Sequence, residues 1–105
     1  MPVKFLCLCR GGNVRSVCLA WHLKDRGHEA ISAGFDYLSA DTLSMLFNWA
    51  DKIVVMQPEF SGLIPLELTH KVMICDVGED RYGNPMNREL KDQVKQWIRQ
   101  ENYAG

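Results

Sequence analysis

A continuous apolar run, Lys52-Ile53-Val54-Val55-Met56, lies at the centre of the 105-residue chain. Its residues do not alternate between apolar and polar, so a strand formed by them would bury both faces. Burial on both faces is typical of a parallel sheet that is covered by helices. The run therefore predicts an inner strand of an α/β fold.

The segments around this run alternate between short apolar stretches and amphipathic stretches. Strands are also predicted at residues 3–9, 30–33 and 71–75. Helices are predicted at residues 16–26, from a cap at Ser39 or Asp41 to about Trp49, and after a cap at Asn87. Pro58 opens at most a short helical segment. The last helix has an apolar face that consists of Leu90, Val94, Trp97 and Ile98.

This order of elements predicts one domain over residues 1–105. Its fold class is α/β, a doubly wound, flavodoxin-like (Rossmann-like) four-stranded parallel sheet with helices on both faces. In such sheets ligands bind at the carboxyl ends of the strands. Cys9, Gln57 and Asp76 lie at or just beyond three of those ends.

Composition and charge exclude several function classes. The net charge of −1 provides no overall basic field for nucleic acid. No apolar run is long enough to predict a membrane span, and residues 1–5 lack the regions of a signal peptide. With no secretory signal we expect the four cysteines to be reduced and the protein to be cytoplasmic.

The loop after the first strand is Cys9-Arg10-Gly11-Gly12-Asn13-Val14-Arg15-Ser16. A helix that begins here offers unpaired N–H groups and a partial positive charge. The two glycines allow successive N–H groups to surround an anion. Arg15 can donate two parallel hydrogen bonds to a phosphate, and the same field favours the nucleophilic thiolate form of Cys9.

Other interpretations of this loop stay open on spacing alone. It lacks the Gly-x-Gly-x-x-Gly and Gly-Lys-Ser/Thr patterns of nucleotide-binding loops. Cys9 could be a buried structural cysteine. Cys7 and Cys9 could be half of a metal site, although no second Cys and His cluster accompanies them.

The loop resembles the phosphate-binding loop of the low-molecular-weight protein tyrosine phosphatases, and the likeness to their compact predicted members is greatest. Three more stretches agree in order: Ile31-Ser32-Ala33-Gly34, the segment from Ala50 to Met56, and the acidic loop that carries Tyr82-Gly83. Three features depart from the family pattern. Gly12 replaces an asparagine, Val14 replaces the second cysteine that could form a disulfide with Cys9, and the acidic loop has no Asp-Pro pair.

The resemblance implies a cysteine-dependent phosphatase with a phosphocysteine intermediate and no cofactor or metal. Cys9 would be the nucleophile and Arg15 would hold the phosphate. The general acid would be Asp80 or, alternatively, Asp76, with Glu79 less favoured. Arg10, Gly11, Gly12, Asn13 and Val14 would surround the phosphate.

Three other side chains are assigned roles by residue type and position. Ser16 could donate a hydrogen bond to the thiolate while it caps the helix. Asn13 could adopt a left-handed turn conformation. Tyr82 could stack on a phenyl ring of the substrate.

The expected substrate is a phosphotyrosine protein or a small aryl phosphate, and inorganic phosphate or another oxyanion should occupy the loop. We expect no nucleic-acid or membrane partner. Two other functions compete: an arsenate reductase, and a phosphate- or phosphopeptide-binding module without turnover. His22, His28 and His70 are expected at the surface, and Trp21, Trp49 and Trp97 in the core.

Overall fold

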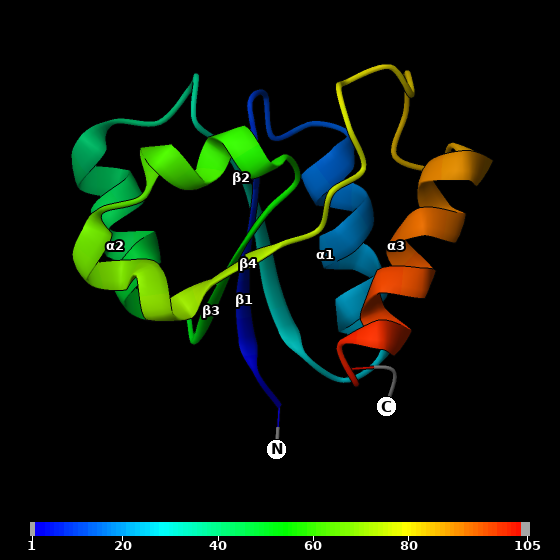
Figure 1. Cartoon of the computed structure of the whole chain (residues 1–105), viewed down its shortest axis with the longest axis horizontal. Helices are drawn as coiled ribbons and strands as arrows, with labels where there is room; N and C mark the ends of the chain where they lie inside the picture. Colours follow the sequence, from blue (N-terminus) through cyan, green and yellow to red (C-terminus); the bar gives the residue numbers. More distant parts are fainter. Residues whose placement is uncertain (1, 104–105) are drawn as a thin grey trace.

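The computed structural model describes residues 2–103, and its four strands pair in the order β2-β1-β3-β4 (Figure 1). Their bounds are β1 (Lys4–Cys9), β2 (Glu29–Gly34), β3 (Lys52–Val55) and β4 (Val72–Ile74). All three pairings are parallel, and β1 lies between β2 and β3. The predicted doubly wound parallel sheet is confirmed, and its direction of winding reverses between β1 and β3.

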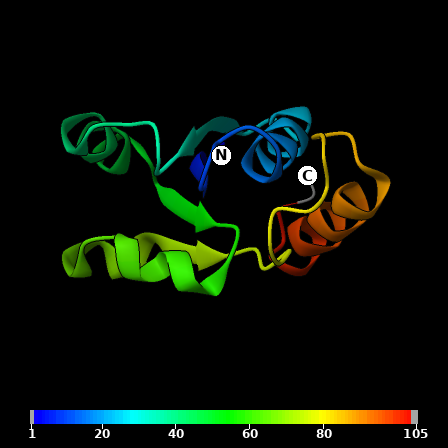
Figure 2. The same ribbon diagram turned by 90° about the horizontal axis from the view of Figure 1, so that it is seen from above.

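The helices cover both faces of the sheet, as predicted (Figure 2). The structure has α1 (Arg15–Asp25), α2 (Ala40–Trp49) and α3 (Arg88–Gln100), and two 3₁₀ helices, η1 (Pro58–Leu63) and η2 (Leu66–Lys71). α1 and α3 pack together on one face, while α2, η1 and η2 lie on the other. Within residues 2–103, every helix is too short or too polar to cross a membrane.

The connection from β3 to β4 has no α-helix. Pro58 opens η1, Gly62 lies within it, and Pro65 precedes η2. Proline donates no backbone N–H and glycine is a weak helix former, so two short 3₁₀ turns replace one long helix.

Side-chain caps mark the start of two helices. Ser39 Oγ accepts a hydrogen bond from Thr42 N at 3.1 Å, so Ser39 rather than Asp41 caps α2. Asn87 Oδ1 accepts from Leu90 N at 3.1 Å and caps α3, as predicted. Each cap satisfies an N–H group that the helix itself leaves free.

The core forms where the sheet meets these helices. Leu6, Leu8, Ile53 and Val55 are fully buried, which confirms that β1 and β3 are inner strands. The predicted apolar face of α3 is buried as well, and it consists of Leu90, Val94, Trp97 and Ile98. Trp97 Nε1 also donates a 2.9 Å hydrogen bond to Ile74 O at the end of β4.

The spacing of Val17, Ala20, Trp21 and Leu23 predicts an inner face for α1, and half of this prediction is wrong. Ala20 and Leu23 are buried as expected. Trp21 is 49% exposed and Val17 is only partly buried. They lie beside exposed Lys24 on one side of the helix, whereas the buried side includes Cys18, His22 and other residues that face the sheet and α3. His22 is therefore a core residue rather than a surface residue, and its Nδ1 lies 2.9 Å from Cys18 O. Among the other tryptophans, Trp97 is buried and Trp49 partly buried.

The end of β2 supports the loop that follows β1. Phe35 N donates to Cys9 O at 3.1 Å, and Asp36 N donates to Arg10 O at 3.0 Å. A Cβ added to Gly34 would lie 2.4 Å from Gly11 C, and one added to Gly12 would lie 2.7 Å from Ala33 C. The two backbones therefore touch, and only glycine allows this approach.

We predict that Gly34→Ala destabilises the protein by about 1–3 kcal/mol, because the added methyl group must displace backbone rather than a flexible side chain. The matched control is Gly62→Ala, since a Cβ there meets nothing within 4 Å. The control should be neutral or stabilising by about 0.4–1 kcal/mol. Urea unfolding of both variants measures the difference, and equal stabilities would contradict the tight contact.

Candidate active site

A pocket lies at the carboxyl ends of the strands, and residues that follow each of the four strands line it. They include Arg10 and Arg15 after β1, Tyr37 after β2, Glu59 after β3 and Asp80 after β4. This is where a doubly wound sheet binds its ligands. The predicted Cys9 loop forms one wall.

Cys9 is the last residue of β1 and is 2% exposed. Its Sγ lies 3.2 Å from Ser16 Oγ and accepts a hydrogen bond from Gly12 N, also at 3.2 Å. The turn that aims this N–H at the sulfur needs the positive φ of 71° at Gly12. A thiolate here would have two hydrogen-bond donors. The predicted contact between Ser16 and Cys9 is present, but the predicted capping role of Ser16 is wrong, because Ser16 lies inside α1.

The N-terminus of α1 has no side-chain cap. Val14 occupies the N-cap position and makes no side-chain hydrogen bond there, and the first turn holds no acidic residue. The first N–H groups of a helix need partners and attract negative charge. An anion bound beside Cys9 would accept hydrogen bonds from these N–H groups and would bring the negative charge that they attract.

Arg15 is 2% exposed, and its guanidinium joins three parts of the site. One terminal nitrogen donates to Gln57 Oε1 and to Gly78 O, the latter at 2.8 Å. The guanidinium carbon lies 5.6 Å from the centre of the Phe60 ring, within reach of a cation–π contact. Its Nε has no hydrogen-bond partner. An unpaired buried donor of a charged group is costly, so this atom requires an acceptor.

The two candidate acids have different surroundings. Asp80 lines the pocket with Arg15, and Glu79 lies beside it. Asp76 Oδ1 instead accepts a hydrogen bond from Gly78 N at 3.1 Å, and Asp76 lines a separate hollow with Gln93 and Trp97.

Tyr82 is 4% exposed and is not among the residues that line the pocket. Its hydroxyl donates to Val77 O and accepts from Gln93 Nε2 at 3.0 Å. A ring held in this way cannot stack on a substrate. Tyr37 lines the pocket and is 76% exposed. No motif in the sequence marks Tyr37 as a site residue, and its position shortly after β2 is the one signal that points to it.

The remaining loop residues play varied parts. Arg10 forms an ion pair with Asp36 at 3.2 Å on the rim. Asn13 is exposed and lines the pocket, but it has no left-handed conformation: among non-glycine residues of 2–103, only Asn102 has a positive φ. Gly12 takes the left-handed position, since it pays no Cβ penalty.

The other three cysteines are free and buried: Cys7, Cys18 and Cys75. Burial raises the pKa of Cys18 to about 11. Burial also raises the pKa values of Cys7 and Cys75 above the usual thiol range. These thiols remain protonated at neutral pH, which makes them poor nucleophiles. Within the described residues, no three His, Cys, Asp or Glu side chains gather to hold a metal ion.

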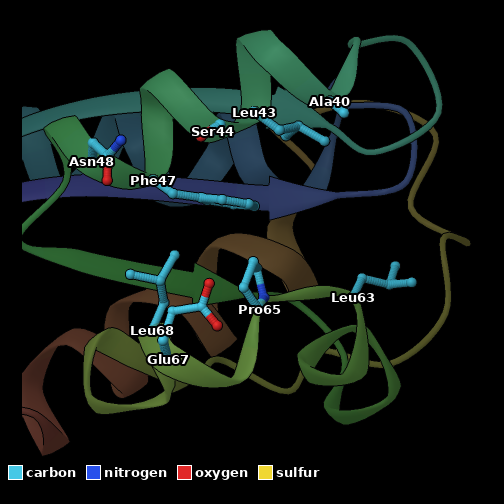
Figure 3. Close-up of a pocket in the computed structure, with 9 residues that line it drawn as sticks. All are labelled: Ala40, Leu43, Ser44, Phe47, Asn48, Leu63, Pro65, Glu67 and Leu68. Atoms are coloured by element: carbon cyan, nitrogen blue, oxygen red, sulfur yellow. The ribbon is translucent and has the colours of Figure 1, made fainter.

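Another hollow, the apolar groove, lies between α2 and the 3₁₀ helices (Figure 3). Leu43 and Phe47 line it from α2, and Leu63 and Leu68 from η1 and η2. Glu67 is the single ionisable side chain among its lining residues. The groove has no cysteine and no cationic side chain among its lining residues, so we assign the chemistry to the pocket at the carboxyl ends of the strands.

Comparison with known proteins identifies the fold. The chain matches the YwlE arginine phosphatase from Geobacillus stearothermophilus with a TM-score of 0.71 and 19% identity, over 96% of this chain and 94% of that one. It matches Vibrio vulnificus Wzb, solved with benzylphosphonate, with a TM-score of 0.71 and 16% identity, over 95% of this chain and 99% of that one.

A low-molecular-weight phosphotyrosine phosphatase from Vibrio cholerae O395 matches with a TM-score of 0.57 and 17% identity, over 97% of this chain and 92% of that one. No family model matches the sequence, and no curated protein matches it significantly. These structural matches extend over nearly the whole chain. The protein therefore has the fold of the low-molecular-weight tyrosine phosphatases, in agreement with the sequence resemblance.

Proposed function

We propose that this protein hydrolyses phosphate monoesters through a phosphocysteine intermediate, and that phosphotyrosine in proteins is its substrate class. One observation carries the proposal. Arg15, at the end of the Cys9 loop, is buried and lines the pocket, and its Nε has no partner. A phosphate oxygen is the acceptor that this geometry suits best, since guanidinium groups bind phosphate through two parallel N–H groups.

The phosphate would lie between the guanidinium group of Arg15 and the backbone N–H groups at the start of α1. The backbone N–H groups of the loop and the uncapped helix N-terminus add donors and partial positive charge. These donors are fixed before the substrate arrives, so they need no rearrangement to stabilise the transition state. The protein's own groups supply this charge, and the mechanism requires no metal or other cofactor.

In the first step, the Cys9 thiolate attacks phosphorus, and the bond from phosphorus to the leaving oxygen breaks. The departing oxygen takes the proton of Asp80 and leaves as a phenol. Gly12 N–H and the Ser16 hydroxyl stabilise the thiolate beforehand. The products of this step are the phenol and phosphocysteine.

In the second step, water attacks the phosphocysteine. The Asp80 carboxylate accepts a proton from this water, and the phosphorus–sulfur bond breaks to release inorganic phosphate. The Cys9 thiolate and the protonated Asp80 are thereby restored. We favour Asp80 over Asp76 because Asp80 lines the pocket, whereas Asp76 accepts a hydrogen bond in a turn outside it.

Two features support an aromatic ester. Exposed Tyr37 lines the pocket and offers a ring face. Benzylphosphonate, an aromatic phosphonate, is the ligand in the Vibrio vulnificus structure. Another structural neighbour is an arginine phosphatase, so a phosphoarginine compound belongs in the assay as a comparison.

The two competing functions have less support. Arsenate reduction of this type passes a disulfide to further cysteines, and the other three thiols are buried and hold their protons. A binding module without turnover does not need a thiol such as that of Cys9, which lies within hydrogen-bond distance of Gly12 N and Ser16 Oγ. The proposal includes a cytoplasmic location, since a nucleophilic thiol stays reduced there.

We predict that Cys9→Ser abolishes turnover of an aryl phosphate but still binds inorganic phosphate, because Arg15 and the loop remain. Phosphate release measures turnover and calorimetry measures binding. Arg15→Lys keeps the charge but loses the paired N–H groups, so both binding and rate should fall. Arg99→Lys, on the exposed end of α3, is the matched control. Turnover by Cys9→Ser at the wild-type rate would refute the mechanism.

We predict that Asp80→Asn lowers the rate by about 10²–10⁴-fold for a phenol that is a poor leaving group. The loss should be small for an acidic phenol, whose oxygen leaves without a proton. Asp76→Asn is the matched control and should show no such dependence. Two aryl phosphates of different leaving-group pKa make the comparison. If the dependence follows Asp76→Asn instead, the roles of the two aspartates are reversed.

A further inference from the structure

The charges around the pocket are unevenly distributed. On the side of β1 and β2, Arg10 and Asp36 neutralise each other in an ion pair. On the side of β3 and β4, the pocket is lined by Glu59, Glu79 and Asp80. Among the ion pairs within residues 2–103, none involves these three carboxylates.

Glu59 and Glu79 are the two carboxylates of this side that take no part in the proposed proton transfer. We call these two residues the acidic rim. Asp80 carries a proton in the first step of the proposed reaction. Glu59 accepts a 2.8 Å hydrogen bond from Gln57 Nε2, which is a neutral amide and leaves the charge in place. The net charge of the whole chain is −1, so no general basic field offsets the rim.

A phosphate dianion that enters this pocket meets attraction and repulsion together. Arg15 and the loop attract it at the floor, while the acidic rim repels it at the mouth. A positive group carried by the substrate beside its phosphate would turn the rim from a repulsive surface into an attractive one.

On the basis of the proposed function, we infer that the protein selects phosphopeptides with lysine or arginine beside the phosphorylated residue. The acidic rim binds those cationic side chains on the side of β3 and β4, while Arg15 binds the phosphate. Tyr37 lies across the pocket, on the side of β2, where it can contact the peptide.

The arrangement suits separate cationic side chains rather than a metal ion. In the part of the chain that the structure describes, no three acidic, His or Cys side chains gather as metal ligands. The buried Arg15, with its unpaired Nε, fixes where the anionic end of the ligand lies. The rim carboxylates come from different elements, η1 and the segment after β4, so they can meet residues on either side of the phosphotyrosine.

The experiment compares two phosphotyrosyl peptides that differ only in their flanking residues, lysine in one and glutamate in the other. The wild-type protein should have a kcat/KM roughly tenfold higher for the lysine peptide at low salt. The ratio should shrink as salt is added, because exposed charges are screened. An aryl phosphate whose only charged group is the phosphate, measured in parallel, reports turnover without any flanking residue.

Two variants test the rim directly, Glu59→Gln and Glu79→Gln. Each removes one charge and retains the size of the side chain, so the preference for the lysine peptide should fall. Glu67→Gln is the matched control, since Glu67 is exposed in the apolar groove of Figure 3 and does not line the phosphate pocket. This control should keep the full preference. Thermal unfolding verifies that each variant is folded.

Each outcome decides between the two proposals. Equal rates for both peptides, a preference for glutamate, or a preference that both rim variants retain would overturn the inference. If the aryl phosphate is hydrolysed in those cases, the proposed function still stands. If no ester is hydrolysed, the proposed function fails, and binding of the two peptides to Cys9→Ser then tests the rim alone. Tighter binding of the lysine peptide supports the inference, and equal binding overturns it.

Discussion

The hydrogen bonds of Arg15 hold together the parts of the site that the sheet brings near one another. The residue begins α1, yet its guanidinium contacts Gln57 after β3 and Gly78 after β4. One nitrogen makes both contacts, which leaves Nε for a ligand. A buried cation with incomplete pairing is tolerable only where an anion completes it. The unpaired Nε of this one side chain is therefore the feature on which the proposed phosphate site depends.

Local patterns in the sequence were sufficient for the framework. The apolar run from Lys52 predicted an inner parallel strand. Asn87 predicted one helix start, and Ser39 or Asp41 predicted another, of which the structure has Ser39. One side of α1 was predicted wrongly, because the sheet and α3 cover His22 and the apolar residues next to it but not Val17 and Trp21. His22 is buried and Trp21 is exposed for this reason. Tertiary contacts decide such cases, and spacing along one helix does not reveal them.

The site was predictable where neighbours in sequence are neighbours in space. Cys9, Ser16 and Arg15 belong to one loop, and their spacing was informative. Tyr37 and Glu59 reach the pocket through strand order, which spacing does not give. The burial of Tyr82 depends on its contacts with Val77 and Gln93, five and eleven residues away along the chain. Loop geometry of this kind follows from packing, so spacing alone did not reveal that Tyr82 is buried.

The hydrogen bond from Trp97 to Ile74 has a consequence for solubility. β4 is an outer strand of the sheet and has only three residues. Outer strands carry unpaired backbone groups to which strands of other molecules can add. The indole of Trp97 occupies the carbonyl oxygen at the end of β4, and a short strand leaves few other groups for such pairing. The side chain that packs α3 against the sheet thus also protects an edge from intermolecular strand addition.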